Sequence, residues 1–253
     1  MRLRRQKKLI KRAGLKSNLH PVNELLSIVA DRKRSQGDRG RAAKHLHDIG
    51  DKRGINFLLK EFFSLEELTD IYTAALALEE SEDIAAVGPL IRALHDKNPH
   101  RRHAAARALG WIGQSPRRAG RALTAMLADH SQPQPAREEA AESLAYLDYA
   151  PSVPVLAKVV TESDPRMRFW ACFALGSIRV ERCQNEIEAT LLSLLSDEGE
   201  MPTFYSVRLE ALGMLGLHFN HRELLQKELD RIDQDSSATK SERFWTGWVR
   251  PKN

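Results

Sequence analysis

The chain has 253 residues, 42% of them hydrophobic and 29% charged, which is enough apolar material for a sizeable core. No stretch approaches the roughly 18 uninterrupted apolar residues of a membrane-spanning helix, and the two cysteines cannot build a disulfide framework. The composition therefore excludes a helical membrane protein and a disulfide-stapled domain, and we expect a cytoplasmic protein with reduced Cys172 and Cys183.

Positive charge is concentrated at the start of the chain. Residues 1–53 hold 16 Lys and Arg against 5 Asp and Glu, whereas the remaining 200 residues hold 23 against 29. The first sixteen residues contain no acid and eight cations, namely Arg2, Arg4, Arg5, Lys7, Lys8, Lys11, Arg12 and Lys16. This density favours an anionic partner, either nucleic acid or an acidic protein surface, with a solubilising tail as the alternative. Membrane binding is not expected, because few apolar residues accompany the charges.

One block of sequence recurs six times. Its central leucines are 32, 31, 35, 31 and 37 residues apart, a spacing that suits one helical hairpin per repeat. Alanine stands four residues before the leucine in five blocks, and an aliphatic residue stands three after it in five, so that one helical face is apolar. The central leucines are Leu46, Leu78, Leu109, Leu144, Leu175 and Leu212.

Between these blocks lie apolar segments that we expect to form the second helix of each hairpin, such as 55–62, 87–94 and 153–160. Proline-containing turns separate the hairpins, at Asn98-Pro99 and Asp164-Pro165 among others. No alternating pattern indicates a strand. The sequence therefore predicts pairs of helices stacked on pairs of helices.

The segments 96–110 and 164–176 resemble HEAT repeats, in particular the short variety first noted in phycobilisome lyases, and the resemblance covers about residues 38–230. It implies an all-α fold, a right-handed α-solenoid (α-α superhelix) of about six HEAT-like hairpins. We expect a basic extension at 1–20, the solenoid at 21–232 and a tail with an aromatic cap at 233–253.

Arginine recurs seven residues before the central leucine, at Arg39, Arg102, Arg137 and Arg168. In HEAT arrays such an arginine bonds to acidic or carbonyl groups of the adjacent unit. We therefore expect a structural ladder, with a row of ligand-binding cations as the alternative.

The resemblance implies that the leucine-centred helices line a concave side. Their outward rows would then carry aromatic and charged side chains, which are typical of interface hot spots. The alternative is that these residues pack under loops or against the next hairpin. The row consists of Arg107, Trp111, Glu139, Glu142, Tyr146, Trp170 and Phe173.

The C-terminal segment contains Trp245 and Trp248 in a polar surrounding. We expect these tryptophans to close the exposed end of the solenoid core. A partner-binding peptide is the alternative.

Catalytic and metal-binding patterns are missing from the sequence. His45 and His47 cannot share a helix face, and His100 and His103 have no Cys or Glu at ligand spacing, so no metal or other cofactor is expected. No P-loop, GxGxxG or serine nucleophile elbow occurs. Deoxyhypusine hydroxylases bind iron through His-Glu dipeptides, which this sequence lacks.

The sequence thus predicts a non-catalytic scaffold or adaptor, a subunit of a larger complex, that binds a protein partner on its concave face. The second hypothesis is an RNA- or DNA-associated subunit that binds through residues 1–16. Two enzyme classes remain as alternatives from the resemblance, bilin lyases and HEAT-like alkylpurine DNA glycosylases. The acidic residues Glu139 and Glu142 in the row oppose a DNA-binding groove.

Overall fold

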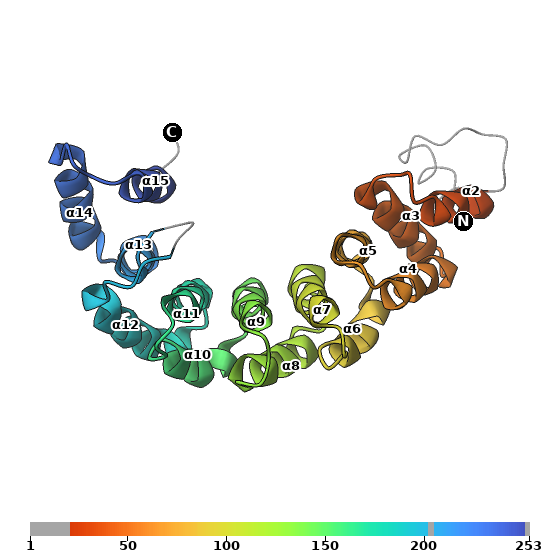
Figure 1. Ribbon diagram of the computed structural model, residues 1–253, viewed down its shortest axis with the longest axis horizontal. Helices are drawn as coiled ribbons and strands as arrows, with labels where there is room; N and C mark the ends of the chain where they lie inside the picture. Colours follow the sequence, from red (N-terminus) through yellow and green to blue (C-terminus); the bar gives the residue numbers. More distant parts are fainter. Residues whose placement is uncertain (1–20, 202–204, 251–253) are drawn as a thin grey trace. The chain divides into compact units, whose positions relative to one another are not determined.

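The computed structural model describes residues 21–201 and 205–250. These residues form α-helices and short 3-10 turns and no strand, which confirms the predicted all-α class (Figure 1). The chain divides into two compact units, Met1–Ala119 and Gly120–Asn253. The helices are α2 (Pro21–Ala30), α3 (Gln36–Asp48), α4 (Arg53–Ser64), α5 (Leu68–Ser81), α6 (Val87–Ala93), α7 (Pro99–Ile112), α8 (Pro116–Ala128), α9 (Gln134–Tyr146), α10 (Val153–Val159), α11 (Pro165–Ser177), α12 (Gln184–Ser193), α13 (Val207–His218), α14 (Arg222–Gln234) and α15 (Lys240–Val249).

Each unit is a stack of helical hairpins in chain order. In the first unit α3, α5 and α7 lie side by side, and α4 and α6 lie against them as a second layer (Figure 1). In the second unit α9, α11 and α13 form the corresponding layer, with α10, α12 and α14 behind them. Helices within a unit contact their neighbours in chain order, as expected for an α-solenoid.

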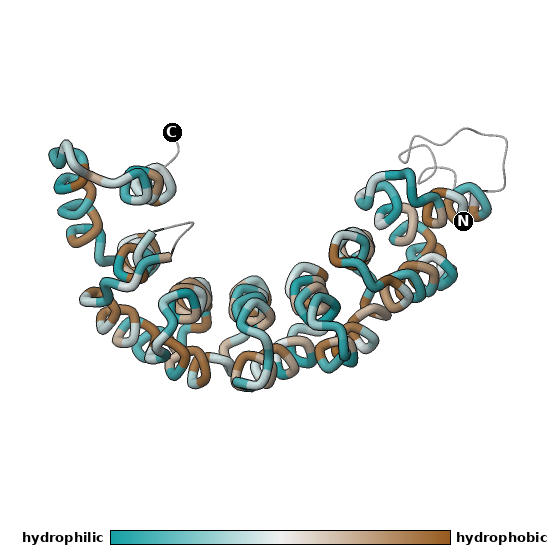
Figure 2. The backbone as a smooth tube through the Cα atoms, in the orientation of Figure 1, coloured by the Kyte–Doolittle hydropathy of each residue, from teal (hydrophilic) through white to brown (hydrophobic). Residues whose placement is uncertain are grey.

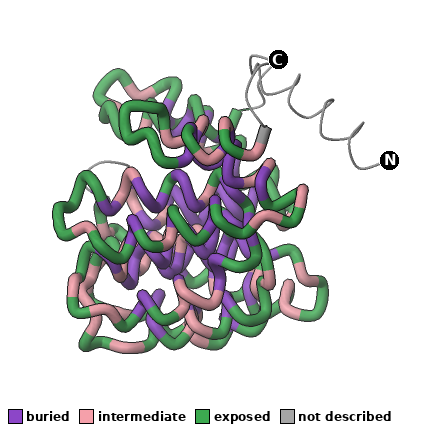
Figure 3. The backbone as a smooth tube through the Cα atoms, turned by 90° about the vertical axis from the view of Figure 1, so that its right-hand side faces the viewer, coloured by how far each residue is buried: buried purple, intermediate pink, exposed green. Residues whose placement is uncertain are grey.

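The repeated leucine and alanine positions form the core of each unit. All six central leucines are at most 5% exposed, and the five alanines four residues before them are buried as well. Small alanine side chains let adjacent helices approach closely, while leucine fills the space between the two layers. Hydrophobic and hydrophilic residues accordingly alternate along the helices (Figure 2), and buried residues alternate with exposed ones turn by turn (Figure 3).

The predicted Asn-Pro and Asp-Pro turns begin two of the leucine-centred helices. The Asn98 side chain accepts a hydrogen bond from the His100 backbone N–H at 2.9 Å, and the Asp164 side chain accepts one from the Arg166 N–H at 2.8 Å. The following proline occupies the first helical position, where its missing N–H costs nothing. The Asn98-Pro99 and Asp164-Pro165 dipeptides therefore fix the starts of α7 and α11.

The arginine ladder joins consecutive helices. Arg39 donates from Nε to the Val29 carbonyl oxygen at 2.9 Å and pairs with Glu61. Arg137 repeats the arrangement in the second unit, because its Nε donates to Leu127 O at 2.8 Å and its Nη2 to Glu162 at 2.6 Å. The structural interpretation of these two arginines is confirmed.

The other two ladder positions differ in detail. Arg168 pairs with Asp197 at 2.6 Å, which again links one hairpin to the next. Arg102, however, donates to Asp96 O at 2.7 Å within its own turn. The neighbouring Arg101 is the buried link there, since it donates to Phe62 O at 3.3 Å and pairs with Asp96 at 2.7 Å. In the third repeat the linking arginine is therefore displaced by one residue.

The C-terminal tail folds as α15, which contacts α13 and α14. Trp245 is fully buried, whereas Trp248 and Phe244 are exposed. A capping box starts the helix, because the Thr239 side chain accepts from the Glu242 N–H and the Glu242 carboxylate accepts from the Thr239 N–H. Trp245 thus packs against the last hairpin, while Trp248 remains 42% exposed.

Helices α3 and α5 approach each other closely at Gly40. A Cβ atom at this position would lie 2.6 Å from the Ala77 carbonyl oxygen, which belongs to a rigid helix backbone. We therefore expect Gly40→Ala to lower the free energy of unfolding by about 1–3 kcal/mol in urea denaturation, although alanine is the better helix former. Gly247→Ala in α15 is the control, because no atom lies within 4 Å of its Cβ position, and it should raise stability by up to about 1 kcal/mol. An equal gain in both variants would contradict the close approach.

Candidate interaction surface

Three aromatic side chains gather on neighbouring helices of the second unit. The rings of Trp170 and Phe173 on α11 are 5.9 Å apart, and Phe173 is 6.5 Å from Tyr146 on α9. Tyr146 is 45% exposed and donates from its hydroxyl to Glu142 at 2.9 Å. We call Glu142, Tyr146, Trp170 and Phe173 the second-unit aromatic cluster.

Helix geometry explains how the cluster forms. Glu142 and Tyr146 are four residues apart and Trp170 and Phe173 are three apart, so that each pair shares one face of its helix. Behind them, Trp170 packs edge-on against the buried Phe169 at 5.5 Å, which fixes the indole from the core side. The cluster is therefore a rigid surface feature that combines aromatic edges and faces with a carboxylate.

The first unit contains a related arrangement on α5 and α7. The Arg107 guanidinium lies over the Trp111 ring, 5.3 Å from its centroid, and Arg107 Nε is 3.3 Å from Glu79. Trp111 is 48% exposed. This is a cation–π contact completed by a carboxylate, the geometry in which an aromatic side chain and an acid hold one arginine.

The predicted row is thus present as two groups, one in each unit, and one of its members is placed differently. Glu139 is buried, not outward, so the prediction for that residue is wrong. Glu139 lies seven residues, nearly two helical turns, before Tyr146 and so shares its side of α9. Its burial therefore comes from what packs over that part of the helix and not from the helical period. The predicted contacts of Arg2, Arg4, Arg5, Lys7, Lys8, Lys11, Arg12 and Lys16 fall outside the described residues and stay a prediction.

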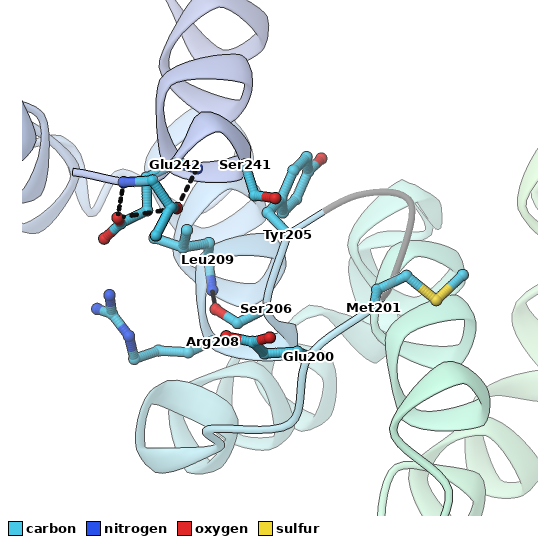
Figure 4. Close-up of a pocket in the computed structure, with 9 residues that line it drawn as sticks. Glu200, Met201, Tyr205, Ser206, Arg208, Leu209, Ser241 and Glu242 are labelled. Atoms are coloured by element: carbon cyan, nitrogen blue, oxygen red, sulfur yellow. Dashed lines mark hydrogen bonds between the residues drawn. The ribbon is translucent and has the colours of Figure 1, made fainter. Parts of the chain in front are cut away.

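The second unit also contains a pocket that the sequence did not indicate. Its volume is about 260 Å³, and residues at the start of α13 and of α15 line it, among them Tyr205, Arg208 and Glu242 (Figure 4). Its charged groups are engaged within the unit, because Arg208 pairs with Glu228 at 2.8 Å and Glu242 caps α15. The pocket is therefore a feature of the packing between the two helices, and we assign no ligand to it.

Beside this pocket lies a buried acid. Glu210 on α13 accepts a hydrogen bond from the Tyr205 hydroxyl at 2.8 Å, and burial raises the pKa of Glu210 from 4.5 to about 7. Burial and the nearby Glu210 also raise the pKa of Tyr205, and burial raises that of the Cys172 thiol. These groups lie in the core, so they bear on stability rather than on a reaction.

Clusters of metal ligands and membrane-spanning helices are both absent from the part of the chain that the structure describes. No three His, Cys, Asp or Glu side chains there are grouped as ligands for a metal ion. No helix among the same residues has the length and apolarity needed to cross a bilayer.

The stacked hairpins and the buried leucine and alanine stripes define an α-solenoid repeat protein. The HEAT repeats family matches residues 69–145 and 120–200, more than half of the sequence, and the chain belongs to this family. No curated protein matches the sequence.

Solved structures with similar arrangements include two engineered proteins and a human enzyme. One engineered protein is 22% identical over 76% of this chain and 94% of its own, with a TM-score of 0.47. The other is 19% identical over 92% of this chain and 69% of its own, with a TM-score of 0.44. Human deoxyhypusine hydroxylase in complex with glycerol is 20% identical over 90% of this chain and 94% of its own, with a TM-score of 0.35.

Proposed function

We propose that this protein is a non-catalytic scaffold that binds a protein partner through the second-unit aromatic cluster. HEAT repeat proteins typically act as protein-interaction scaffolds, and the exposed Tyr146 on α9, in ring contact with the half-buried Trp170 and Phe173 on α11, carries the proposal. Aromatic residues dominate the energy of protein interfaces because they bury a large area with little loss of side-chain freedom.

The chemistry of the cluster favours a partner with a cationic side chain. A Lys or Arg of the partner could lie against the ring of Trp170 or Tyr146 while pairing with the Glu142 carboxylate. The first unit holds its own Arg107 in such an arrangement, between Trp111 and Glu79. The proposed contact between the two proteins therefore has the same chemistry as this contact within the chain, a cation held between an aromatic ring and a carboxylate.

We expect Trp170→Ala to reduce partner recovery at least tenfold. A hot-spot aromatic contributes about 2 kcal/mol or more, and 1.4 kcal/mol corresponds to a factor of ten in affinity. The measurement is affinity purification of the tagged protein from its native host, with the co-purifying proteins quantified by mass spectrometry. Tyr146→Ala provides a second test, because this side chain is half exposed and its loss should not disturb the core.

Phe244→Ala is the matched control. Phe244 is an exposed aromatic side chain on α15 and lies outside the cluster. Its replacement should leave recovery unchanged, and circular dichroism should show the same helix content in all variants. Undiminished recovery with both cluster variants would rule out the cluster as the binding site.

A further inference from the structure

Two helices of the hairpin layer opposite α5 and α7 carry arginines and no acid. Helix α6 contains Arg92, the first turn of helix α8 contains Arg117 and Arg118, and neither helix contains Asp or Glu. All three side chains are exposed. We call these three residues the arginine face.

The guanidinium groups converge instead of dispersing. A Cβ atom at Gly88 of α6 would lie 4.0 Å from Arg92 Nη1 and 3.7 Å from Arg118 Nη2, so that both groups lie over the same point of α6. Arg117 precedes Arg118 in the same turn of α8. The arginine face thus brings cations of α6 and α8 together, and neither helix carries a carboxylate.

This placement is unfavourable for the isolated chain. Arg117 and Arg118 lie in the first turn of α8, which has no acidic residue, and cations at this end oppose the helix dipole by about 0.3–1 kcal/mol each. No described carboxylate forms an ion pair with any of the three arginines, whereas Arg39, Arg137 and Arg168 all have such partners. A local cost without compensation inside the protein points to a partner outside it.

The surroundings of the arginine face select the class of partner. Helices α6 and α8 present no exposed large apolar side chain, and neither contains an aromatic residue. The two helices therefore do not themselves supply the apolar centre of a protein interface, the inserted side chains of a membrane-binding helix or the rings on which unpaired bases stack. Arginine in such a setting is suited to bidentate contact with phosphate.

We propose that the arginine face binds the phosphate backbone of a nucleic-acid duplex with little dependence on base sequence. The contact is electrostatic, so its affinity falls with salt in proportion to the number of phosphates neutralised. This surface is distinct from the second-unit aromatic cluster, and it can bind whether or not that cluster holds a protein.

The test uses the full chain and a fluorescently labelled 20-base-pair duplex, as DNA and as RNA, in anisotropy titrations between about 50 and 200 mM salt. The test variant carries Arg92→Gln, Arg117→Gln and Arg118→Gln. We expect the slope of log K against log salt to decrease in magnitude by about 2–3, because each phosphate contact contributes about 0.9. Far-UV circular dichroism checks that the exposed substitutions leave the fold intact.

Two variants with the same loss of charge serve as controls. One replaces the exposed and paired residues Arg34, Arg41 and Arg53 by glutamine, and the other replaces Lys7, Lys8 and Lys11. The proposal is supported if the arginine-face variant loses more of the slope than the first control in either duplex. The proposal is overturned if the arginine-face variant binds the duplexes like the wild type, or if only the second control loses binding. It is also overturned if the wild type binds anionic vesicles or polyglutamate but no duplex.

Discussion

Replacement of Glu61 by methionine is expected to lower the free energy of unfolding of the first unit by about 3–5 kcal/mol. Glu61 pairs with Arg39, and the two side chains are only 5% and 1% exposed. Without the carboxylate, the Arg39 guanidinium remains buried with only the Val29 carbonyl oxygen as an acceptor at 2.9 Å. An unpaired buried charge is far more costly than a missing ion pair at the surface. Urea denaturation measures the change.

Two variants separate this effect from a general loss of charge. Arg41→Gln removes an exposed pair with Asp38, 2.9 Å long, and should cost less than about 1 kcal/mol. The double variant Arg39→Met/Glu61→Met removes both buried charges and should recover most of the stability lost by Glu61→Met. If the double variant loses as much stability as Arg39→Met and Glu61→Met lose together when each is measured alone, the pairing of the two residues does not contribute.

Glu210→Gln is expected to remove a pH-dependent destabilisation of the second unit. The pKa of Glu210 is about 7 in the folded protein and 4.5 in an ordinary setting, so the folded state binds more protons than the unfolded state between these values. Stability therefore falls as the pH rises from about 4.5 to about 7, by roughly 3 kcal/mol, since each pKa unit corresponds to 1.36 kcal/mol. Below pH 4.5 both states are protonated and the penalty vanishes.

Urea denaturation of Glu210→Gln and of the wild type at pH 5 and at pH 8 measures this pH-dependent destabilisation. The quantity compared is the difference in unfolding free energy between the two proteins at each pH. The free energy of unfolding of the variant should rise relative to that of the wild type at the higher pH, because glutamine keeps an acceptor for the Tyr205 hydroxyl and carries no charge. Glu223→Gln on the surface of α14 is the control and should show the same small difference at both pH values. A difference for Glu210→Gln that does not change with pH would contradict the raised pKa.

The repeat architecture could be predicted from the sequence because its signal is local and periodic. A leucine such as Leu109 and the alanine four residues before it define the buried stripe of one helix, and six copies of this pattern define the stack. The breakers at Asn98-Pro99 and Asp164-Pro165 fix helix starts through hydrogen bonds that span only two residues. Such features do not depend on distant parts of the chain.

Features that depend on distances between helices could not be predicted in this way. The prediction that Glu139 points outward was wrong because this residue shares a side of α9 with the exposed Tyr146, and only the packing along the helix distinguishes the two. The pair Tyr205–Glu210 and the convergence of Arg92 and Arg118 over Gly88 arise from packing, and no sequence pattern marked them. The aromatic residues of the second-unit cluster could be named, but not their mutual ring contacts.

Because each helix contacts its neighbours in chain order, the protein has no single centre on which all its parts depend. Its unfolding on heating need not be one all-or-none event, since one end of such an array can melt while the other remains ordered. The free energies expected for Glu61→Met and Glu210→Gln then report on the compact units that contain these residues, Met1–Ala119 and Gly120–Asn253, and not on one cooperative transition of the whole chain.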